Sequence, residues 1–194
     1  MKSKSKRRLI IKVFSGFHDP SLTVQFIQQI QDGLNKNLLE DTLISFESNS
    51  MVMNSWSFNR EESLDGEGNE KTSTLLIGFS AGVINAAIAA NIMVNQQSNP
   101  VALIAIDGWG VPLFSKAFPV FRFSHDLFTH SSSTILGGQG IFVADPPSSH
   151  LELWKSPSQV KGWFISPDEK NPAMAMNADQ AIVEIISHLM KGEA

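Results

Sequence analysis

The chain has 194 residues, 42% of them hydrophobic, and a formal net charge of −4. This length suits one domain with a substantial core. Five of the first eight residues are Lys or Arg, so the rest of the chain carries a net charge of −9 once these five are subtracted from −4. A domain with this negative charge repels phosphate groups, which disfavours a groove that binds nucleic acid. We therefore expect residues 1–8 to form a disordered basic tail in front of a single domain over residues 9–194.

Cysteine is absent, which excludes disulfides, thiolate metal ligands and a cysteine nucleophile. The apolar residues that follow the basic tail are interrupted at Lys12 and lead to no small-residue cleavage site, so they do not read as a signal peptide. No segment is apolar for long enough to cross a membrane. We expect a cytoplasmic protein that needs no metal and no cofactor and binds no nucleic acid, and we leave its oligomeric state open.

The first part of the predicted domain alternates strand and helix. Residues 9–14, LIIKVF, form an apolar run typical of a strand. Asp19 and Pro20 then have the pattern of a helix start, with Asp at the N-cap and Pro at the first helical position. Residues 43–46 predict a second strand, and residues 59–71 are polar and acidic and contain glycine, which indicates an exposed loop.

Residues 78–82, GFSAG, contain a G-x-S-x-G pattern. Residues 73–77 before it predict a buried strand, and the alanine-rich segment after it predicts a long buried helix. A sharp strand-to-helix turn around Ser80 is the context that a nucleophile elbow requires. In such a turn Gly78 and Gly82 avoid a collision between helix and strand, and the N-terminus of the helix favours negative charge beside the serine.

Three more apolar runs predict strands, at residues 101–106, 119–123 and 141–143. Residues 131–140 are rich in Ser and Gly and predict a loop. Residues 151–160 favour a helix that breaks at Pro157, and residues 177–191 have the apolar stripe of a final helix. Apolar strands in β-α-β order indicate an α/β fold, a mostly parallel sheet with helices on both faces in a three-layer sandwich.

A serine hydroxyl becomes a good nucleophile only when a base takes its proton, and the base needs an acid to orient it. Three histidines lie between Ser80 and the last helix: His125, His130 and His150. The last of these, His150, follows a Pro-Pro turn after the last predicted strand, which is the position expected for the base.

Three aspartates compete for the role of acid: Asp107, Asp126 and Asp145. Chain order favours Asp126, which follows the strand at residues 119–123, and leaves Asp107 as the alternative. Asp107 also suits a simple Asp-Gly turn after its strand. Asp145 lies in the same loop as His150, too close in sequence to reach across and orient it.

Together these motifs resemble the α/β-hydrolase family, and the short chain without a cap is similar to the minimal bacterial lipases and esterases. The family's elbow matches residues 78–82, its acid-bearing segment resembles residues 124–126, and its base-bearing segment resembles residues 150–153, HLEL. The resemblance implies hydrolysis of an ester or thioester of a small-molecule acyl substrate through an acyl-enzyme. It also implies two backbone N–H donors for the oxyanion, and we assign these to Ala81 and Phe17.

Five side chains near the predicted strand ends are candidates for an acyl pocket: His18, Phe79, Trp109, Phe128 and Trp154. Each of the aromatic residues also suits an ordinary core. The alternative function is a binding or scaffold protein that kept an α/β-hydrolase fold and lost the chemistry. A nucleotide-binding domain is disfavoured because no G-x-G-x-x-G pattern and no Walker-type lysine is present.

Overall fold

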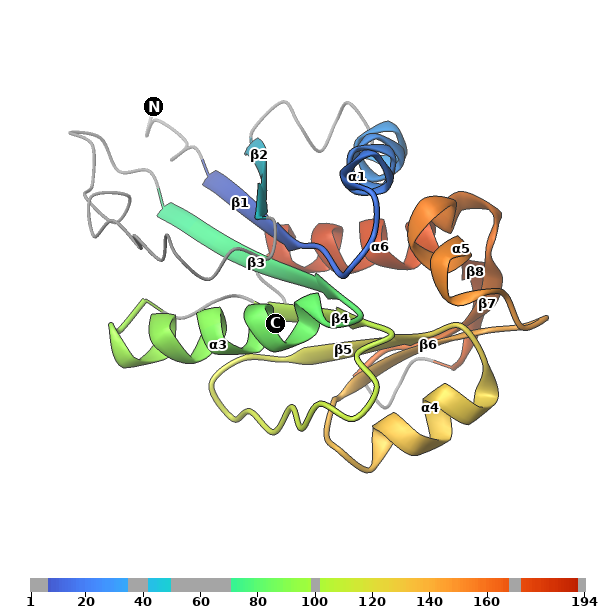
Figure 1. The fold of residues 1–194 in the computed structure, drawn as a ribbon. Helices are drawn as coiled ribbons and strands as arrows, with labels where there is room; N and C mark the ends of the chain where they lie inside the picture. The colour runs from blue at the N-terminus through green and yellow to red at the C-terminus, as the bar shows by residue number, and fades with distance from the viewer. Residues whose placement is uncertain (1–6, 35–41, 50–70, 99–101, 168–171, 192–194) are drawn as a thin grey trace.

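The structure, a computed structural model, describes residues 7–34, 42–49, 71–98, 102–167 and 172–191 (Figure 1). Within these residues eight strands form one sheet, in the order β2-β1-β3-β4-β5-β6-β7-β8. The strands are β1 (Arg7–Phe14), β2 (Thr42–Asn49), β3 (Lys71–Phe79), β4 (Ala102–Ile106), β5 (Val120–Ser124), β6 (Gly140–Ala144), β7 (Lys161–Ile165) and β8 (Met174–Asn177). Strands β1 to β6 are parallel, whereas β7 is antiparallel to β6 and β8 is antiparallel to β7.

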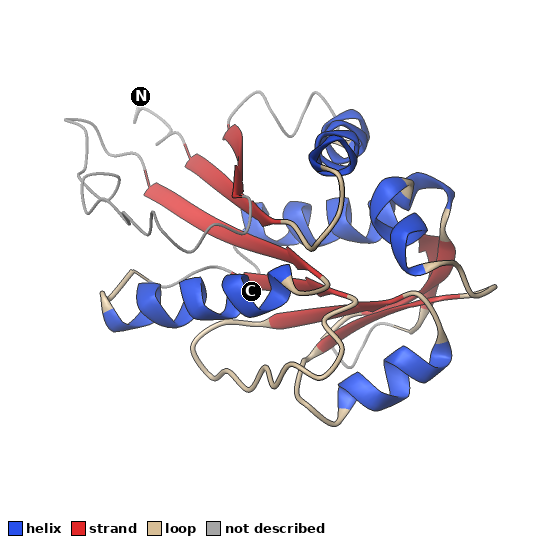
Figure 2. Ribbon diagram, in the orientation of Figure 1, coloured by secondary structure: helices blue, strands red, loops and turns tan. Residues whose placement is uncertain are grey.

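Helices follow most of the parallel strands. The described helices are α1 (Pro20–Gly33), α3 (Gly82–Asn95), α4 (Leu127–Thr134), α5 (His150–Lys155), the short 3-10 helix η2 (Pro157–Gln159) and α6 (Ala178–Lys191). Helices α1, α5 and α6 lie on one side of the sheet, and α3 and α4 lie on the other (Figures 1 and 2). None of the helices in the described segments is both long enough and apolar enough to span a membrane.

Alternate residues of β3 are buried on opposite faces of the sheet. Leu75 and Ile77 belong to the hydrophobic cluster that contains Phe26 of α1. Leu76, between them, belongs to the cluster that contains Val83 of α3. Because both faces are covered, the central strands are apolar throughout instead of alternating with polar residues.

The predicted α/β class and the mostly parallel sheet are confirmed, and the predicted apolar runs overlap β1 to β6. The first helix also begins as the sequence indicated. Asp19 is its N-cap, and the side chain of Asp19 accepts a hydrogen bond of 2.8 Å from the backbone N–H of Ser21. Pro20 occupies the first helical position, where a missing N–H costs nothing.

The loop predicted for residues 131–140 is wrong in its first part, because α4 continues to Thr134. The hydroxyl of Ser131 donates to the carbonyl of Leu127 at 2.8 Å, and that of Thr134 donates to the carbonyl of His130 at 2.9 Å. These bonds to carbonyls one turn earlier let a segment rich in Ser and Thr remain helical.

The two antiparallel strands at the end of the sheet were missed by the sequence analysis. In β7 exposed and buried residues alternate, the pattern of a strand with one face covered. At the other end of the chain, Arg7 and Arg8 belong to β1 instead of a tail, because their backbone continues the register with β2 and β3. Residues 1–6 and most of the loop predicted at residues 59–71 lie outside the described residues.

A buried arginine holds the loops that flank β5. Arg122 is 1% exposed, and its guanidinium donates to the backbone carbonyls of Gly108, Val111, Leu136 and Gly137. No carboxylate of the described residues pairs with it, and burial lowers the pKa of Arg122 to about 10. Neutral carbonyls therefore take the place of a counter-ion. Because two of them precede β5 and two precede β6, one side chain holds both of these loops.

Replacing this guanidinium should destabilise the protein strongly. In Arg122→Lys a single ammonium group cannot reach all four carbonyls, and we expect the free energy of unfolding to fall by about 3 kcal/mol or more, since hydrogen bonds to charged groups contribute about 1.5–3 kcal/mol each. Urea unfolding measures this. The matched control is Arg8→Lys at an exposed position, which should change stability by less than about 0.5 kcal/mol. Equal effects of the two substitutions would contradict the role given to Arg122.

Candidate active site

The carboxyl ends of the parallel strands meet at one edge of the sheet, and the candidate residues follow them. They are Phe17 after β1, Ser80 after β3, Asp107 after β4, His125 after β5 and His150 after β6. Between β1 and β3 the order of strand addition reverses, because β2 lies on the far side of β1. Ligand sites in open α/β sheets lie beyond the carboxyl ends at such a switch point.

Ser80 forms the turn between β3 and α3 and is half-buried. Its φ of 53° is in the left-handed region, which is uncommon for a residue other than glycine. The N–H of Ser80 donates to the carbonyl of Ile106 at 2.9 Å, and its carbonyl accepts the N–H of Val83 at 3.1 Å. A Cβ on Gly82 would lie 2.3 Å from the carbonyl oxygen of Phe14, so the turn leaves no room for a side chain there. The predicted strand–turn–helix around the serine is present.

Asp107 is a buried carboxylate with a full set of partners. Its side chain is 1% exposed, and Oδ1 accepts the backbone N–H of His125 at 3.0 Å. Oδ2 lies 2.9 Å from Nδ1 of His125 and 2.8 Å from Nδ1 of His150. Since a carboxylate only accepts, both imidazoles carry their proton on Nδ1. Three donors thus offset the cost of removing this charge from water.

His150 is the first residue of α5, and its side chain is 43% exposed. Its ring stacks on Phe79 with centroids 4.7 Å apart, and Phe79 stacks in turn on Trp154 at 4.8 Å. Because Phe79 directly precedes Ser80, this stacking places His150 beside the elbow. No hydrogen bond joins Ser80 Oγ to an imidazole of the described residues, and such bonds often tighten only when substrate binds.

A second histidine shares the carboxylate, and the sequence analysis did not assign it to the site. Besides its bond to Asp107, His125 has Nε2 3.4 Å from Oδ2 of Asp126. Its carbonyl accepts the N–H of Ser148 at 2.9 Å, which ties it to the loop that carries His150. The two imidazole rings meet edge to face with centroids 5.9 Å apart. The available signal was position: His125 follows β5 directly, just as Asp107 follows β4.

Asp126, predicted as the acid, does not contact His150. It is the N-cap of α4, and its Oδ1 accepts the backbone N–H of Thr129 at 2.7 Å. That hydrogen bond lowers the pKa of Asp126, and the charge of His125 adds a smaller effect in the same direction. The carboxylate in contact with His150 is the alternative acid, Asp107.

The two backbone donors predicted for an oxyanion lie on segments that touch. A Cβ on Gly16 would be 3.0 Å from Cβ of Ser80, so the loop after β1 packs against the elbow. Neither the N–H of Phe17 nor the N–H of Ala81 donates a hydrogen bond to a described residue. Within the part of the chain that the structure describes, both are therefore available to bind a ligand oxygen, and Ala81 directly precedes the first residue of α3.

The five predicted pocket residues separate into three groups. Phe79 and Trp154 are buried and belong to the hydrophobic core beneath His150, so they do not line an open pocket. His18 packs beside Phe79 at 5.5 Å between ring centroids, with its Nδ1 bonded to the carbonyl of Asp19. Trp109 and Phe128 are exposed at the strand ends.

Asp107, His125 and His150 also form a cluster with the composition of a metal site. One ligand atom from each lies within 4.8 Å of the other two. His130, the remaining histidine considered as a base, stands apart on α4. Burial lowers its pKa, and its Nδ1 has no partner among the described residues.

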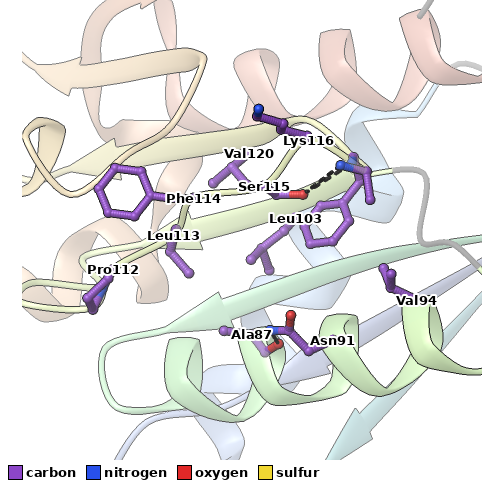
Figure 3. Close-up of a pocket in the computed structure, with 12 residues that line it drawn as sticks. Ala87, Asn91, Val94, Leu103, Pro112, Leu113, Phe114, Ser115, Lys116 and Val120 are labelled. Atoms are coloured by element: carbon purple, nitrogen blue, oxygen red, sulfur yellow. Dashed lines mark hydrogen bonds between the residues drawn. The ribbon is translucent and has the colours of Figure 1, made fainter.

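A cavity of about 290 Å³ lies at the opposite end of the strands (Figure 3). It is bounded by α3 and residues 112–118, together with Leu103 and Val120 near the amino ends of β4 and β5. Most of its lining is apolar, and Ser115 Oγ is occupied by accepting the N–H groups of two residues of the same loop. The catalytic candidates do not line this cavity.

Comparison with protein-family models and with curated proteins finds no match for this chain. Its function therefore has to be inferred from the site itself. A hydroxyl on a strained turn, an imidazole held in one tautomer by a buried carboxylate, and two free N–H groups are the parts that acyl transfer requires.

Proposed function

We propose that the protein is a serine hydrolase of the α/β-hydrolase type that cleaves an ester or thioester through an acyl-enzyme. The observation that carries this proposal is the bond between His150 and the buried carboxylate of Asp107, next to the turn that presents Ser80. Ser80 is the nucleophile, His150 the base and Asp107 the acid. Helices on both faces of a largely parallel sheet suit the three-layer architecture of that family.

In the first half-reaction Ser80 Oγ attacks the acyl carbon while Nε2 of His150 takes the hydroxyl proton. Asp107 makes this transfer feasible, because its carboxylate accepts a hydrogen bond from the Nδ1–H of His150. The proton therefore stays on Nδ1, and the lone pair of Nε2 remains available for the serine proton. The imidazolium then gives its proton to the departing alcohol or thiol, and the acyl group remains on Ser80 as an ester.

The negative oxygen of each tetrahedral intermediate would lie against the free N–H groups of Ala81 and Phe17. The N-terminus of α3, a helix of 14 residues, adds a favourable dipole at the same place. In the second half-reaction His150 takes a proton from water, the hydroxide attacks the acyl carbon, and Ser80 leaves with the proton returned by the imidazolium.

An apolar acyl group is the substrate class that the surroundings favour. Four large apolar side chains are exposed in segments that directly follow the carboxyl ends of the strands: Phe17, Trp109, Leu127 and Phe128. Exposed apolar side chains gathered around a reactive group are typical of binding sites for apolar ligands.

Removal of the serine hydroxyl should abolish turnover. We expect Ser80→Ala to lower kcat on p-nitrophenyl esters by about 10⁴–10⁶ and to lose labelling by a fluorophosphonate probe, since triad members act as a unit. The control is Ser148→Ala at the same edge of the sheet, whose hydroxyl bonds, among the described residues, to the carbonyl of Ser149 and which should keep activity and labelling. A parent protein that the probe does not label would instead support the binding-protein alternative.

The two aspartates should differ sharply. In Asp107→Asn an amide replaces an acceptor that two imidazoles share, and we expect kcat to fall by about 10⁴. Asp126→Asn should change kcat by no more than about threefold, because asparagine caps a helix about as well as aspartate. Steady-state kinetics on one ester compares them, and the reverse ranking would restore Asp126 as the acid.

The two histidines on Asp107 should differ as well. His150→Asn removes the proposed base, so kcat should fall by about 10⁴ or more. His125→Asn removes a neighbour that positions the carboxylate, and we expect a loss of no more than about 10². His130→Asn, on α4 and away from Asp107, serves as the control and should keep full activity. A larger loss with His125→Asn than with His150→Asn would make His125 the base.

A further inference from the structure

The proposed triad uses one histidine on Asp107, and the protein has two. His125 and His150 approach the same carboxylate oxygen through the same ring atom, at 2.9 and 2.8 Å. The surplus histidine is also the one whose second nitrogen faces another carboxylate, that of Asp126. This arrangement goes beyond what a serine hydrolase needs.

We propose that Asp107 Oδ2, His125 Nδ1 and His150 Nδ1 bind one Zn²⁺ ion, and that zinc reversibly switches the hydrolase off. The inhibitory part of this proposal rests on the proposed function, whereas the binding part does not. It departs from the sequence analysis, which expected no metal. Two imidazoles and a carboxylate are ligands that Zn²⁺ accepts, with water completing a four-coordinate site.

The three ligand atoms need only a small rearrangement to hold the ion. They lie within 4.8 Å of one another, and the carboxylate oxygen is 2.8–2.9 Å from each nitrogen. In a tetrahedral site with bonds of about 2.0–2.1 Å, neighbouring ligand atoms are about 3.3 Å apart. Each contact to Asp107 therefore lengthens by roughly half an ångström as zinc replaces the two Nδ1 protons.

Asp126 lies where it can accept a hydrogen bond from the ring of His125 that binds zinc. A histidine that binds zinc through one nitrogen usually donates the other N–H to a carboxylate or a carbonyl. Here Nε2 of His125 lies 3.4 Å from Oδ2 of Asp126. The charges of Asp107 and Asp126 together then balance the two positive charges of the ion.

Zinc and catalysis exclude each other through the tautomer of His150. In the catalytic form proposed above, the ring proton is on Nδ1, held by Asp107, and the lone pair of Nε2 is the one that takes the proton of Ser80. Zinc on Nδ1 takes the lone pair of Nδ1 itself, so the single proton of the neutral ring moves to Nε2. A ring protonated at Nε2 cannot accept the proton of Ser80. Zinc therefore inhibits without touching the serine.

Binding is tested on Ser80→Ala, which lacks the nucleophile but retains all three ligands. Titration calorimetry with Zn²⁺ should show one ion per chain. Adding His125→Asn should weaken binding by at least about 10²-fold, and adding Asp126→Asn should weaken it by about 10–100-fold, the usual effect of removing a second-layer partner. Adding His130→Asn is the control and should change nothing. Circular dichroism confirms that each variant is folded.

Unchanged zinc affinity in both the His125→Asn and the Asp126→Asn backgrounds would overturn the site, as would an absence of binding. Asp126→Asn keeps this test decisive if His125→Asn fails to fold.

Inhibition is tested on the protein with Ser80 in place, using a p-nitrophenyl ester. Zinc should lower the rate, EDTA should restore it, and His125→Asn should keep its own residual rate when zinc is added. Zinc that binds without inhibiting would overturn the tautomer mechanism, and zinc that accelerates hydrolysis would make the ion catalytic instead. If no ester is cleaved, the proposed function fails while the calorimetry still decides the metal site.

Discussion

The burial of one carboxylate organises the edge of the sheet at which the candidate residues meet. Asp107 is 1% exposed, and an ionised carboxylate without partners would be costly at that depth. Its partners come from two other places in the chain, the end of β5 and the start of α5. The carboxylate can be satisfied only when β4, β5 and β6 stand side by side in their observed register. The same bonds that stabilise the charge therefore assemble the site.

The buried guanidinium of Arg122 stabilises the same edge of the sheet through backbone carbonyls. Arg122 lies in β5, three residues before His125, and its guanidinium reaches the carbonyl of Gly108, which directly follows Asp107. The cation and the anion do not pair with each other. The cation is satisfied by loop carbonyls, and the anion by an amide and two imidazoles. Each charge thus fixes a different part of the chain around the short strands β4 and β5.

The sequence predicted the six parallel strands and the strand–turn–helix at Ser80 because both signals are local. A buried parallel strand is a short apolar run, and the turn at Ser80 needs only two glycines at fixed spacing. Chain order favoured Asp126 as the partner of His150, whereas the carboxylate in contact with His150 is that of Asp107. Both residues follow the carboxyl ends of adjacent strands, and chain order does not say which side chain turns inward. One local signal was overlooked: Asp126 precedes a helix in the same way as Asp19, which was recognised as a cap. The alternation of exposed and buried residues in β7 was a second local signal from which this strand could have been predicted.

No pattern in the sequence could show that His125 and His150 share Oδ2 of Asp107. This contact depends on the directions of two side chains that lie 25 positions apart. That shared oxygen also limits which nitrogen of each ring is available. Because Asp107 holds the proton of both on Nδ1, only Nε2 can act as a base under the proposed mechanism. The surroundings of Nε2 then differ. In His125 it lies 3.4 Å from Oδ2 of Asp126, whereas in His150 it belongs to a ring stacked on Phe79, the residue before Ser80. Asp126 therefore lies on the Nε2 side of His125, and the ring whose stacking partner adjoins Ser80 is that of His150.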